Sequence, residues 1–215
     1  AALKTAPIKA GTGKGVYSFT MSVSPLDCMG CGVCVGVCPT KALTMVPQHE
    51  EAAQAEVFDY TVNKVSRKPE MEDIKTVKGS QFKQPLLEFS GSCAGCAETS
   101  YARLVTQLFG ERMYISNATG CSSIWGGPAP TTPYTVNKES GRGPAWANSL
   151  FEDNAEHGLG MYLGQKKIRD DLKAKVETIA DKVPEAQAWL DTFDDTDANQ
   201  AASKALIAAL EAKDC

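Results

Sequence analysis

Apolar and polar positions follow three successive patterns between residues 85 and 117, and each pattern predicts one element. Pro85–Ser92 is mostly apolar and ends in small residues, as a buried strand does. Residues 97–110 predict a helix that ends at Gly110, with an apolar stripe of Tyr101, Leu104, Val105 and Leu108. Met113–Asn117 is the next predicted strand. A strand, a helix and a second strand in this order indicate an α/β unit with a parallel sheet.

Residues 1–50 predict a smaller unit of mixed structure. Val16–Met21 has the alternation of a short strand, Thr40–Leu43 suits a helical turn, and Leu43–Pro47 suits a closing strand. The glycines at 11, 13 and 15 lack the preceding strand and the spacing of a nucleotide-binding loop, so we interpret them as a flexible linker. Strand, loop, helical turn and strand make half of a ferredoxin-like domain.

The other segments predict a connector, a long loop and a helical region. Residues 48–84 are polar with little periodicity and contain one candidate strand at 57–62. Residues 126–164 are rich in Gly, Pro and Asn and are predicted as an ordered loop, because they also carry aromatic residues. From Gln165 the apolar spacing predicts three helices; the second starts at Pro184, and Thr196 or Asp197 caps the third. We expect these helices to pack without chemistry of their own.

Candidate chemistry in the small unit comes from Cys28, Cys31, Cys34 and Cys38, which are followed directly by Pro39. The C-x₂-C-x₂-C-x₃-C-P spacing is that of bacterial [4Fe–4S] ferredoxins. Thiolates are the soft ligands that such clusters take, and short spacers let one loop wrap around the cluster. A structural zinc site is the alternative, but zinc ligands usually form two pairs with a longer spacer between them. The run therefore predicts a [4Fe–4S] cluster.

The last cysteine of this run points to a second cluster. In two-cluster ferredoxins the fourth cysteine of each run ligates the other cluster. Three further cysteines would then be needed, and residues 1–27 contain none. The chain also starts at Ala1 rather than at Met. It is either a one-cluster unit or a piece of a longer polypeptide, and we favour the piece.

A second set of cysteines lies in the predicted α/β unit. Cys93 and Cys96 form a C-x-x-C pair, and Cys121 follows the next predicted strand. Such a pair serves as a redox dithiol, as half of a zinc site, or as part of a [4Fe–4S] site. The third cysteine, in an equivalent loop, favours a metal or a cluster. The fourth ligand is expected beyond residue 215, with Cys215 a free thiol.

Composition and charge narrow the class of protein. With 43% hydrophobic and 22% charged residues and a net charge of −4, the chain is ordinary for a globular protein and has no basic cluster for nucleic acid. No apolar run reaches the ~18–20 residues of a membrane span, and no secretory signal opens the chain. Eight cysteines in metal-type spacings predict a reducing cytoplasm rather than disulfides.

These features together resemble the pyruvate:ferredoxin oxidoreductases of the single-polypeptide, homodimeric type. The resemblance spans most of residues 20–160. It is carried by the first cysteine run, Ser90–Thr99, Asn117–Trp125 and Gly143–Glu156. A ferredoxin unit ahead of the thiamine-diphosphate domain is typical of the fused form.

The resemblance implies an enzyme that decarboxylates pyruvate oxidatively on thiamine diphosphate and transfers the acetyl group to coenzyme A. Electrons would pass through three [4Fe–4S] clusters to ferredoxin or flavodoxin. It implies one cluster ligated by Cys93, Cys96 and Cys121 near thiamine, an outer one ligated by Cys28, Cys31 and Cys34, and a neighbouring cluster reached by Cys38. Cys121 and Glu98 are implied to contact thiamine diphosphate. For Glu98 the alternative is a first-turn carboxylate that the helix dipole favours.

The same resemblance implies the division of the chain. It predicts the second half of a ferredoxin-like 2[4Fe–4S] α+β unit (1–50), a connector (51–84), the first part of an α/β thiamine-diphosphate domain (85–164) and a helical insertion (165–215). A Gly-Asp-Gly…Asn segment that would hold Mg²⁺ is absent from the printed sequence. We therefore expect an internal segment that is inactive alone and works with the rest of its polypeptide in a cytoplasmic homodimer.

Three other functions remain open at this point, and one of them is a zinc-binding structural module. The remaining two are redox proteins. One is a ferredoxin-like electron carrier without thiamine chemistry. The other is an oxidoreductase for a different 2-oxoacid, such as 2-oxobutyrate, 2-oxoglutarate or an indolyl oxoacid.

Overall fold

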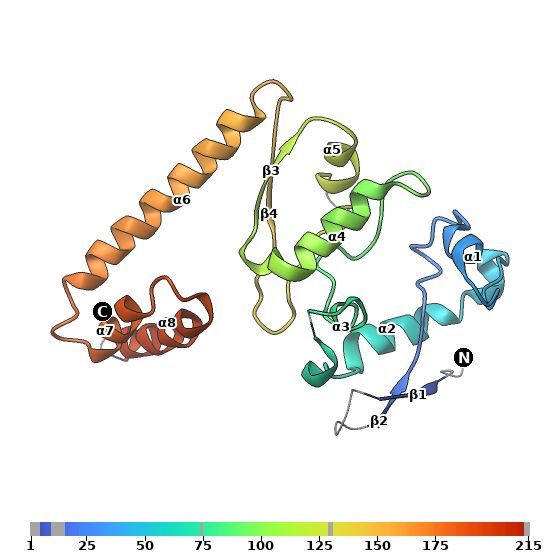
Figure 1. Cartoon of the computed structure of the whole chain (residues 1–215), viewed down its shortest axis with the longest axis horizontal. Helices are drawn as coiled ribbons and strands as arrows, with labels where there is room; N and C mark the ends of the chain where they lie inside the picture. Colours follow the sequence, from blue (N-terminus) through green and yellow to red (C-terminus); the bar gives the residue numbers. More distant parts are fainter. Residues whose placement is uncertain (1–4, 10–15, 74, 129–130, 213–215) are drawn as a thin grey trace. The chain divides into compact units, whose positions relative to one another are not determined.

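The computed structural model describes residues 5–9, 16–73, 75–128 and 131–212. The chain forms two compact units that divide between Phe151 and Glu152, and each has its own packing (Figure 1). The predicted linker glycines at 11, 13 and 15 and Cys215 lie outside the described residues. The four-part division expected from the sequence stays a prediction.

The first unit opens with a two-stranded antiparallel sheet. Strand β1 (Ala6–Lys9) pairs with β2 (Val16–Phe19), and Ala6 lies opposite Phe19. The predicted strand at 16–21 is thus confirmed in its first four residues, whereas β1 had no clear signal. Helix α1 (Val33–Val37) follows inside the cysteine run. The predicted helical turn at 40–43 and strand at 43–47 are wrong, because residues 41–47 are irregular and have no strand partner in the described chain.

The connector is largely helical, not extended. Helix α2 (Gln54–Lys64) replaces the predicted strand at 57–62. Val57, Phe58 and Thr61 recur at helical spacing, and the Thr61 hydroxyl donates to the Phe58 carbonyl at 2.7 Å. Short helices flank α2. Helix η1 (Gln48–Glu51) precedes it, and η2 (Pro69–Met71) and α3 (Val77–Ser80) follow it.

The α/β part of the first unit contains α4 (Ala97–Phe109), η3 (Gly110–Arg112), β3 (Tyr114–Ala118), α5 (Cys121–Gly126) and β4 (Ala145–Ser149). Strands β3 and β4 are parallel, with Tyr114 opposite Ala145, and they run side by side in Figure 1. The predicted helix and the strand after it are confirmed, but the parallel partner of that strand is β4 and not the predicted strand at 85–92. The loop predicted over 126–164 is wrong in part, because β4 lies within it.

The predicted strand at 85–92 does not join this sheet. Leu86 and Leu87 are buried, as predicted, with 3% and 2% of their surface exposed. Their segment makes only an isolated bridge, in which the Glu88 N–H donates to the Pro133 carbonyl at 2.8 Å. Pro85 has no N–H to offer a ladder, which makes this segment a poor central strand.

Helix α4 buries polar residues instead of its predicted apolar stripe. Thr106 and Gln107 are 1% and 2% exposed, whereas Tyr101 is 70% exposed. The Gln107 amide donates to the Ser80 carbonyl at 3.2 Å, so the buried amide group is satisfied. Apolar spacing therefore predicted the helix correctly but not its buried face.

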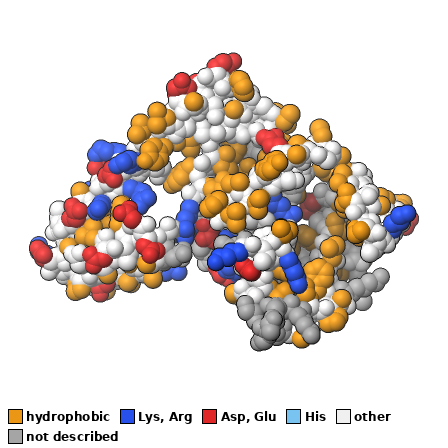
Figure 2. Space-filling view, viewed as in Figure 1, with side chains coloured by type: hydrophobic (Ala, Val, Ile, Leu, Met, Phe, Trp, Pro, Cys, Tyr) orange, Lys and Arg blue, Asp and Glu red, His pale blue; other side chains and the backbone are white. Residues whose placement is uncertain are grey.

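The second unit consists of three helices, α6 (Asn154–Glu177), α7 (Pro184–Asp191) and α8 (Thr196–Glu211). Its core contains Val176, Val183, Ala186, Trp189 and Leu206. On the face shown in Figure 2, charged side chains gather on this unit. All three predicted helices are confirmed, but α6 starts eleven residues before Gln165. Helix α8 begins at Thr196, and the carboxylate of Asp195 just before it accepts from a first-turn N–H (Ala198, 3.0 Å). The predicted cap at Asp197 falls on a side chain outside the described part of the structure.

No helix in the described part of the chain combines the length and the apolar character that crossing a membrane requires.

Candidate functional site

The loop that carries the first three cysteines is held at its start and bent by glycines. The Ser24 hydroxyl donates to the Asp27 carboxylate at 2.6 Å, and the Cys28 N–H donates to the Ser24 carbonyl at 3.0 Å. Gly30 and Gly32 have φ values of 68° and 75°, in the left-handed region that side chains disfavour. The sequence therefore places glycine where the loop must reverse between consecutive cysteines.

The thiols of this run are free, and those of Cys28, Cys31 and Cys34 are exposed. Cys38 is half-buried, and the Ala42 N–H donates to its Sγ at 3.3 Å. A hydrogen bond with the Thr40 hydroxyl, followed by that from Ala42, lowers the pKa of the Cys38 thiol. Both contacts favour the thiolate, which is the form that binds iron.

Two glycines of the run have no neighbouring atoms where a side chain would begin. A Cβ added at Gly32 or Gly36 would meet no other atom within 4 Å. Four thiols at this spacing on one loop have the ligand chemistry that an iron–sulfur cluster requires. In the described residues, however, no three Cys, His, Asp or Glu side chains converge as metal ligands. The fit therefore rests on ligand type and spacing.

The loop of Cys93 and Cys96 is a tight turn held by hydroxyl groups, of which those of Ser92 and Thr99 belong to buried residues. The Cys96 N–H donates to the Cys93 carbonyl at 3.1 Å, and Gly95 between them has a φ of 74°. Thr99, in the first turn of α4, donates to the Cys96 carbonyl at 3.2 Å. Ser90 and Ser92 in turn donate to the Thr99 hydroxyl at 3.2 and 3.4 Å. This network fixes the C-x-x-C turn to the start of α4.

Cys121 begins α5 just beyond the carboxyl end of β3. The loop before it is tied to the end of β4, since the Thr119 N–H and hydroxyl donate to the Ser149 carbonyl at 3.1 and 2.6 Å. Asn117 donates to the Asn148 side chain at 2.9 Å. The predicted position of Cys121 at a strand end is confirmed, and ligands commonly bind at such an edge.

Sequence reasoning assigned no role to Asn148, although its side chain joins the two strand ends. The segment was predicted as loop, and the available signal was the short run Ala145–Ser149 between turn residues. Asn148 also accepts from the Ser123 hydroxyl at 3.0 Å, so it helps to hold the first turn of α5.

Glu98 lies in the first turn of α4, and its carboxylate is close enough to Tyr134 to affect it. Burial raises the pKa of the Tyr134 phenol, and the negative charge of Glu98 raises this pKa further. Tyr134 belongs to the loop between α5 and β4. The role of Glu98 toward a cofactor stays a prediction.

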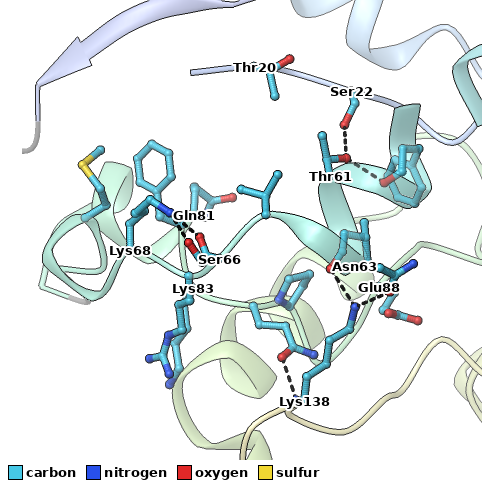
Figure 3. A pocket seen from close by; sticks show the side chains of 18 of the residues that line it. Thr20, Ser22, Thr61, Asn63, Ser66, Lys68, Gln81, Lys83, Glu88 and Lys138 are labelled. Carbon is cyan, nitrogen blue, oxygen red and sulfur yellow. Dashed lines mark hydrogen bonds between the residues drawn. The ribbon is translucent and has the colours of Figure 1, made fainter. Parts of the chain in front are cut away.

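A cavity of about 1160 Å³ lies beside the first cysteine run, with Cys28 in its lining. Figure 3 shows Lys68 and Ser66 on one side of it and Lys138, Asn63 and Glu88 on the other. Lys68 donates to the Ser66 hydroxyl at 2.6 Å, and Lys138 donates to the Asn63 side chain at 3.0 Å. From the sequence, the charged residues of the connector were predicted to form a solvated surface. Neither periodicity nor spacing connects residues 63–68 with residue 138.

The comparisons with known proteins agree on the chemistry of the first cysteine run. Residues 21–44 match a family model described as a 4Fe-4S binding domain. This match contains all four cysteines of the run.

The chain is also similar over most of its length to much longer enzymes. It is 57% identical over 169 residues to a pyruvate-flavodoxin oxidoreductase of Enterobacter agglomerans, covering 78% of this chain and 14% of that protein. It is 55% identical over 190 residues to a pyruvate:ferredoxin oxidoreductase of Moorella thermoacetica, covering 83% of this chain and 16% of that protein. A Cryptosporidium parvum pyruvate dehydrogenase [NADP(+)] is 54% identical over 169 residues, 78% of this chain and 9% of that protein.

Proposed function

We propose that this chain, which is similar over most of its length to a segment of the pyruvate:ferredoxin and pyruvate-flavodoxin oxidoreductases, is the cluster-bearing part of such an enzyme. The enzyme oxidises pyruvate to acetyl-coenzyme A and CO₂ and passes the electrons to ferredoxin or flavodoxin. The observation that carries this proposal is the first cysteine run, which lies in the segment similar to the 4Fe-4S binding domain and sits on a glycine-bent loop.

In this proposal the chain contributes the ligands of the electron path. Cys28, Cys31 and Cys34 ligate one [4Fe–4S] cluster, and Cys38 reaches a neighbouring one. The lowered pKa of the Cys38 thiol suits a ligand that binds iron as thiolate. The turn of Cys93 and Cys96, with Cys121 at the start of α5, ligates a third cluster.

Thiamine diphosphate, held through Mg²⁺, supplies the carbanion and radical chemistry when it is bound. The protein's task is to bind and orient it. We assign to the Glu98 carboxylate a hydrogen bond with this cofactor, and to the Cys121 loop a contact with it. The side-chain bonds among Asn117, Asn148 and Ser123 keep that loop in one conformation.

Pyruvate-dependent reduction of ferredoxin by the enzyme that contains this chain tests the proposal. We expect the reaction to require both thiamine diphosphate and coenzyme A. Cys96→Ser is expected to abolish ferredoxin reduction while part of the pyruvate decarboxylation persists. Reduction of ferredoxin without thiamine diphosphate would instead favour a simple electron carrier.

A further inference from the structure

The segment from Cys93 to Cys96 is a closed β-turn with a free thiol at each end. The Cys96 N–H donates to the Cys93 carbonyl at 3.1 Å, and Gly95 at the third position has a φ of 74°. These are the features of a type II turn. Such a turn keeps the Cα atoms of its first and fourth residues within about 7 Å, and disulfides span Cα separations of about 4.4–6.8 Å. The backbone therefore already has the geometry that a disulfide between the two cysteines needs.

Side-chain hydroxyls hold the second cysteine of this turn. The Thr99 hydroxyl donates to the Cys96 carbonyl at 3.2 Å and accepts from the Ser90 and Ser92 hydroxyls at 3.2 and 3.4 Å. Thr99 and Ser92 are 8% and 9% exposed, so these bonds are shielded from water. Cys93, in contrast, is exposed, and Cys96 is half-buried. A small oxidant can reach the first thiol while the turn stays in place.

The C-x-x-C pairs of the first cysteine run are not closed in this way. Among the described residues, no backbone hydrogen bond joins the Cys31 N–H to the Cys28 carbonyl or the Cys34 N–H to the Cys31 carbonyl. In the pair of Cys31 and Cys34, the left-handed glycine is Gly32, at the second position. That pair has the same spacing as Cys93 and Cys96 without the closed turn, which makes it a matched comparison.

We propose that Cys93 and Cys96 form a reversible disulfide in the cluster-free chain, with a small disulfide such as oxidised glutathione as the oxidant. The Cys93 thiolate attacks one sulfur of the small disulfide, which releases one thiol and leaves a mixed disulfide on Cys93. The Cys96 thiolate then attacks the Cys93 Sγ, which forms the protein disulfide and releases the second thiol. The two protein thiols lose two electrons and two protons, and the small disulfide gains them as two thiols.

This inference goes beyond the proposed function and does not depend on it, because it concerns the thiols before any group is bound. In a reducing cytoplasm the two thiols predominate, and such disulfides are transient. Under oxidising conditions the disulfide protects both sulfurs, because thiols reverse it, whereas sulfonic acids are irreversible. A disulfide offers no thiolate to a metal, so the pair can act as a ligand only after reduction.

Equilibration of the chain with reduced and oxidised glutathione tests the proposal. The parent is the whole chain in which Cys93 and Cys96 are kept and the other six cysteines are changed to Ser. The comparison chain keeps only Cys31 and Cys34. Alkylation of the free thiols followed by mass spectrometry gives the disulfide fraction, and from it the equilibrium constant with glutathione. Circular dichroism checks that each variant is folded.

We expect an equilibrium constant at least about 5-fold higher for the parent than for the comparison chain, since a backbone hydrogen bond closes its turn. Gly95→Ala should lower the constant of the parent about 5- to 30-fold, because alanine disfavours the left-handed conformation. Gly141→Ala is the matched control and should leave the constant unchanged, since Gly141 also has a positive φ (68°) and open space beside it. Thr99→Val, which removes the hydroxyl, should lower the constant about 2- to 10-fold, and Thr99→Ser should keep it.

Each outcome decides the proposal. A parent that forms no internal disulfide, or that carries mainly mixed disulfides with glutathione, would overturn it. Equal constants for the two pairs, or an unchanged constant in Gly95→Ala, would show that the turn does not promote the bond. If Gly95→Ala does not fold, the comparison of Thr99→Val with Thr99→Ser decides. Failure here leaves the cluster content of the native chain unaffected, so it is distinguishable from failure of the proposed function.

Discussion

At the scale of single residues, two glycines of the first cysteine run differ in backbone conformation. Gly32 has a φ of 75°, whereas Gly36 lies inside helix α1. An added Cβ meets no atom within 4 Å at either position, so steric contact does not distinguish them. The difference between the two is one of backbone conformation alone.

Gly32→Ala should therefore destabilise the first unit, and Gly36→Ala should not. We expect Gly32→Ala to lower the free energy of unfolding by about 1–2 kcal/mol, the cost of a left-handed alanine. Gly36→Ala should raise it by up to about 1 kcal/mol, because alanine favours a helix. Urea denaturation of both variants checks this, and equal effects would contradict it.

Glu88 provides a prediction about pH. Burial raises the pKa of its carboxyl, and the nearby charge of Lys138 only partly opposes this. The folded chain then binds a proton more tightly than the unfolded chain, so the contribution of Glu88 to stability is present at low pH and is lost as pH rises through the folded pKa.

Glu88→Gln removes this pH-dependent contribution. The melting temperature of the variant minus that of the wild type should increase from about pH 4 to pH 7, since the usual Glu pKa is about 4.3. Thermal melts at several pH values measure the difference. A difference that is constant over this range, or that falls with pH, would show that the carboxyl is not shifted upward.

At the scale of elements, the second unit contains a core position with no spare room. Ala186 in α7 is 0% exposed and packs in the core with Val183, Trp189 and Leu206. Ala188, two residues later, is exposed on the same helix. The two alanines make a matched pair for testing the packing.

Ala186→Leu should cost about 1–3 kcal/mol of stability, because extra methyl groups in a filled core force side chains and backbone to shift. Ala188→Leu should change stability by less than about 0.5 kcal/mol, as surface substitutions usually do. Chemical denaturation followed by circular dichroism compares them. Similar stability of the two variants would mean that α7 is not packed as described.

The elements also show where sequence patterns are informative. Helix α8 was predicted because its apolar spacing extends over several turns, and the shorter α7 because Pro184 marks its start. Residues 57–62 were assigned to a strand because their apolar and polar residues alternate. Over only six residues, the same pattern also fits one face of a helix. Only the neighbouring turns of α2 resolve that ambiguity.

The same limit applies to the candidate site. The spacing within each cysteine set was readable, because the ligands of one loop are close in sequence. The contact of Gly91 with Trp125 and that of Asn117 with Asn148 join residues far apart in the chain. No local pattern indicates such contacts, since they depend on how the segments pack.

At the scale of the whole molecule, the two compact units differ in content: the first carries the described cysteines, and the second is a group of packed helices. All seven described cysteines lie in the first unit, and the helices of the second unit have their own apolar core. A group bound by the native cysteines stabilises the residues that hold it. Cluster assembly should therefore affect the two units differently.

Hydrogen exchange before and after anaerobic reconstitution with iron and sulfide measures this difference. We expect slower exchange in residues 28–38 and 90–126 and unchanged exchange in the core of α7 and α8. Equal slowing in both units would contradict the separation.

We propose above all that the cysteines of this chain hold [4Fe–4S] clusters. The most direct measurement is iron and sulfide analysis of the reconstituted chain, together with the EPR spectrum of its reduced form. We predict about four iron and four sulfide per cluster. We also predict a reduced-cluster EPR signal that Cys28→Ser, Cys31→Ser and Cys34→Ser each weaken. A chain that binds stoichiometric zinc and shows no cluster signal after reduction would contradict the account.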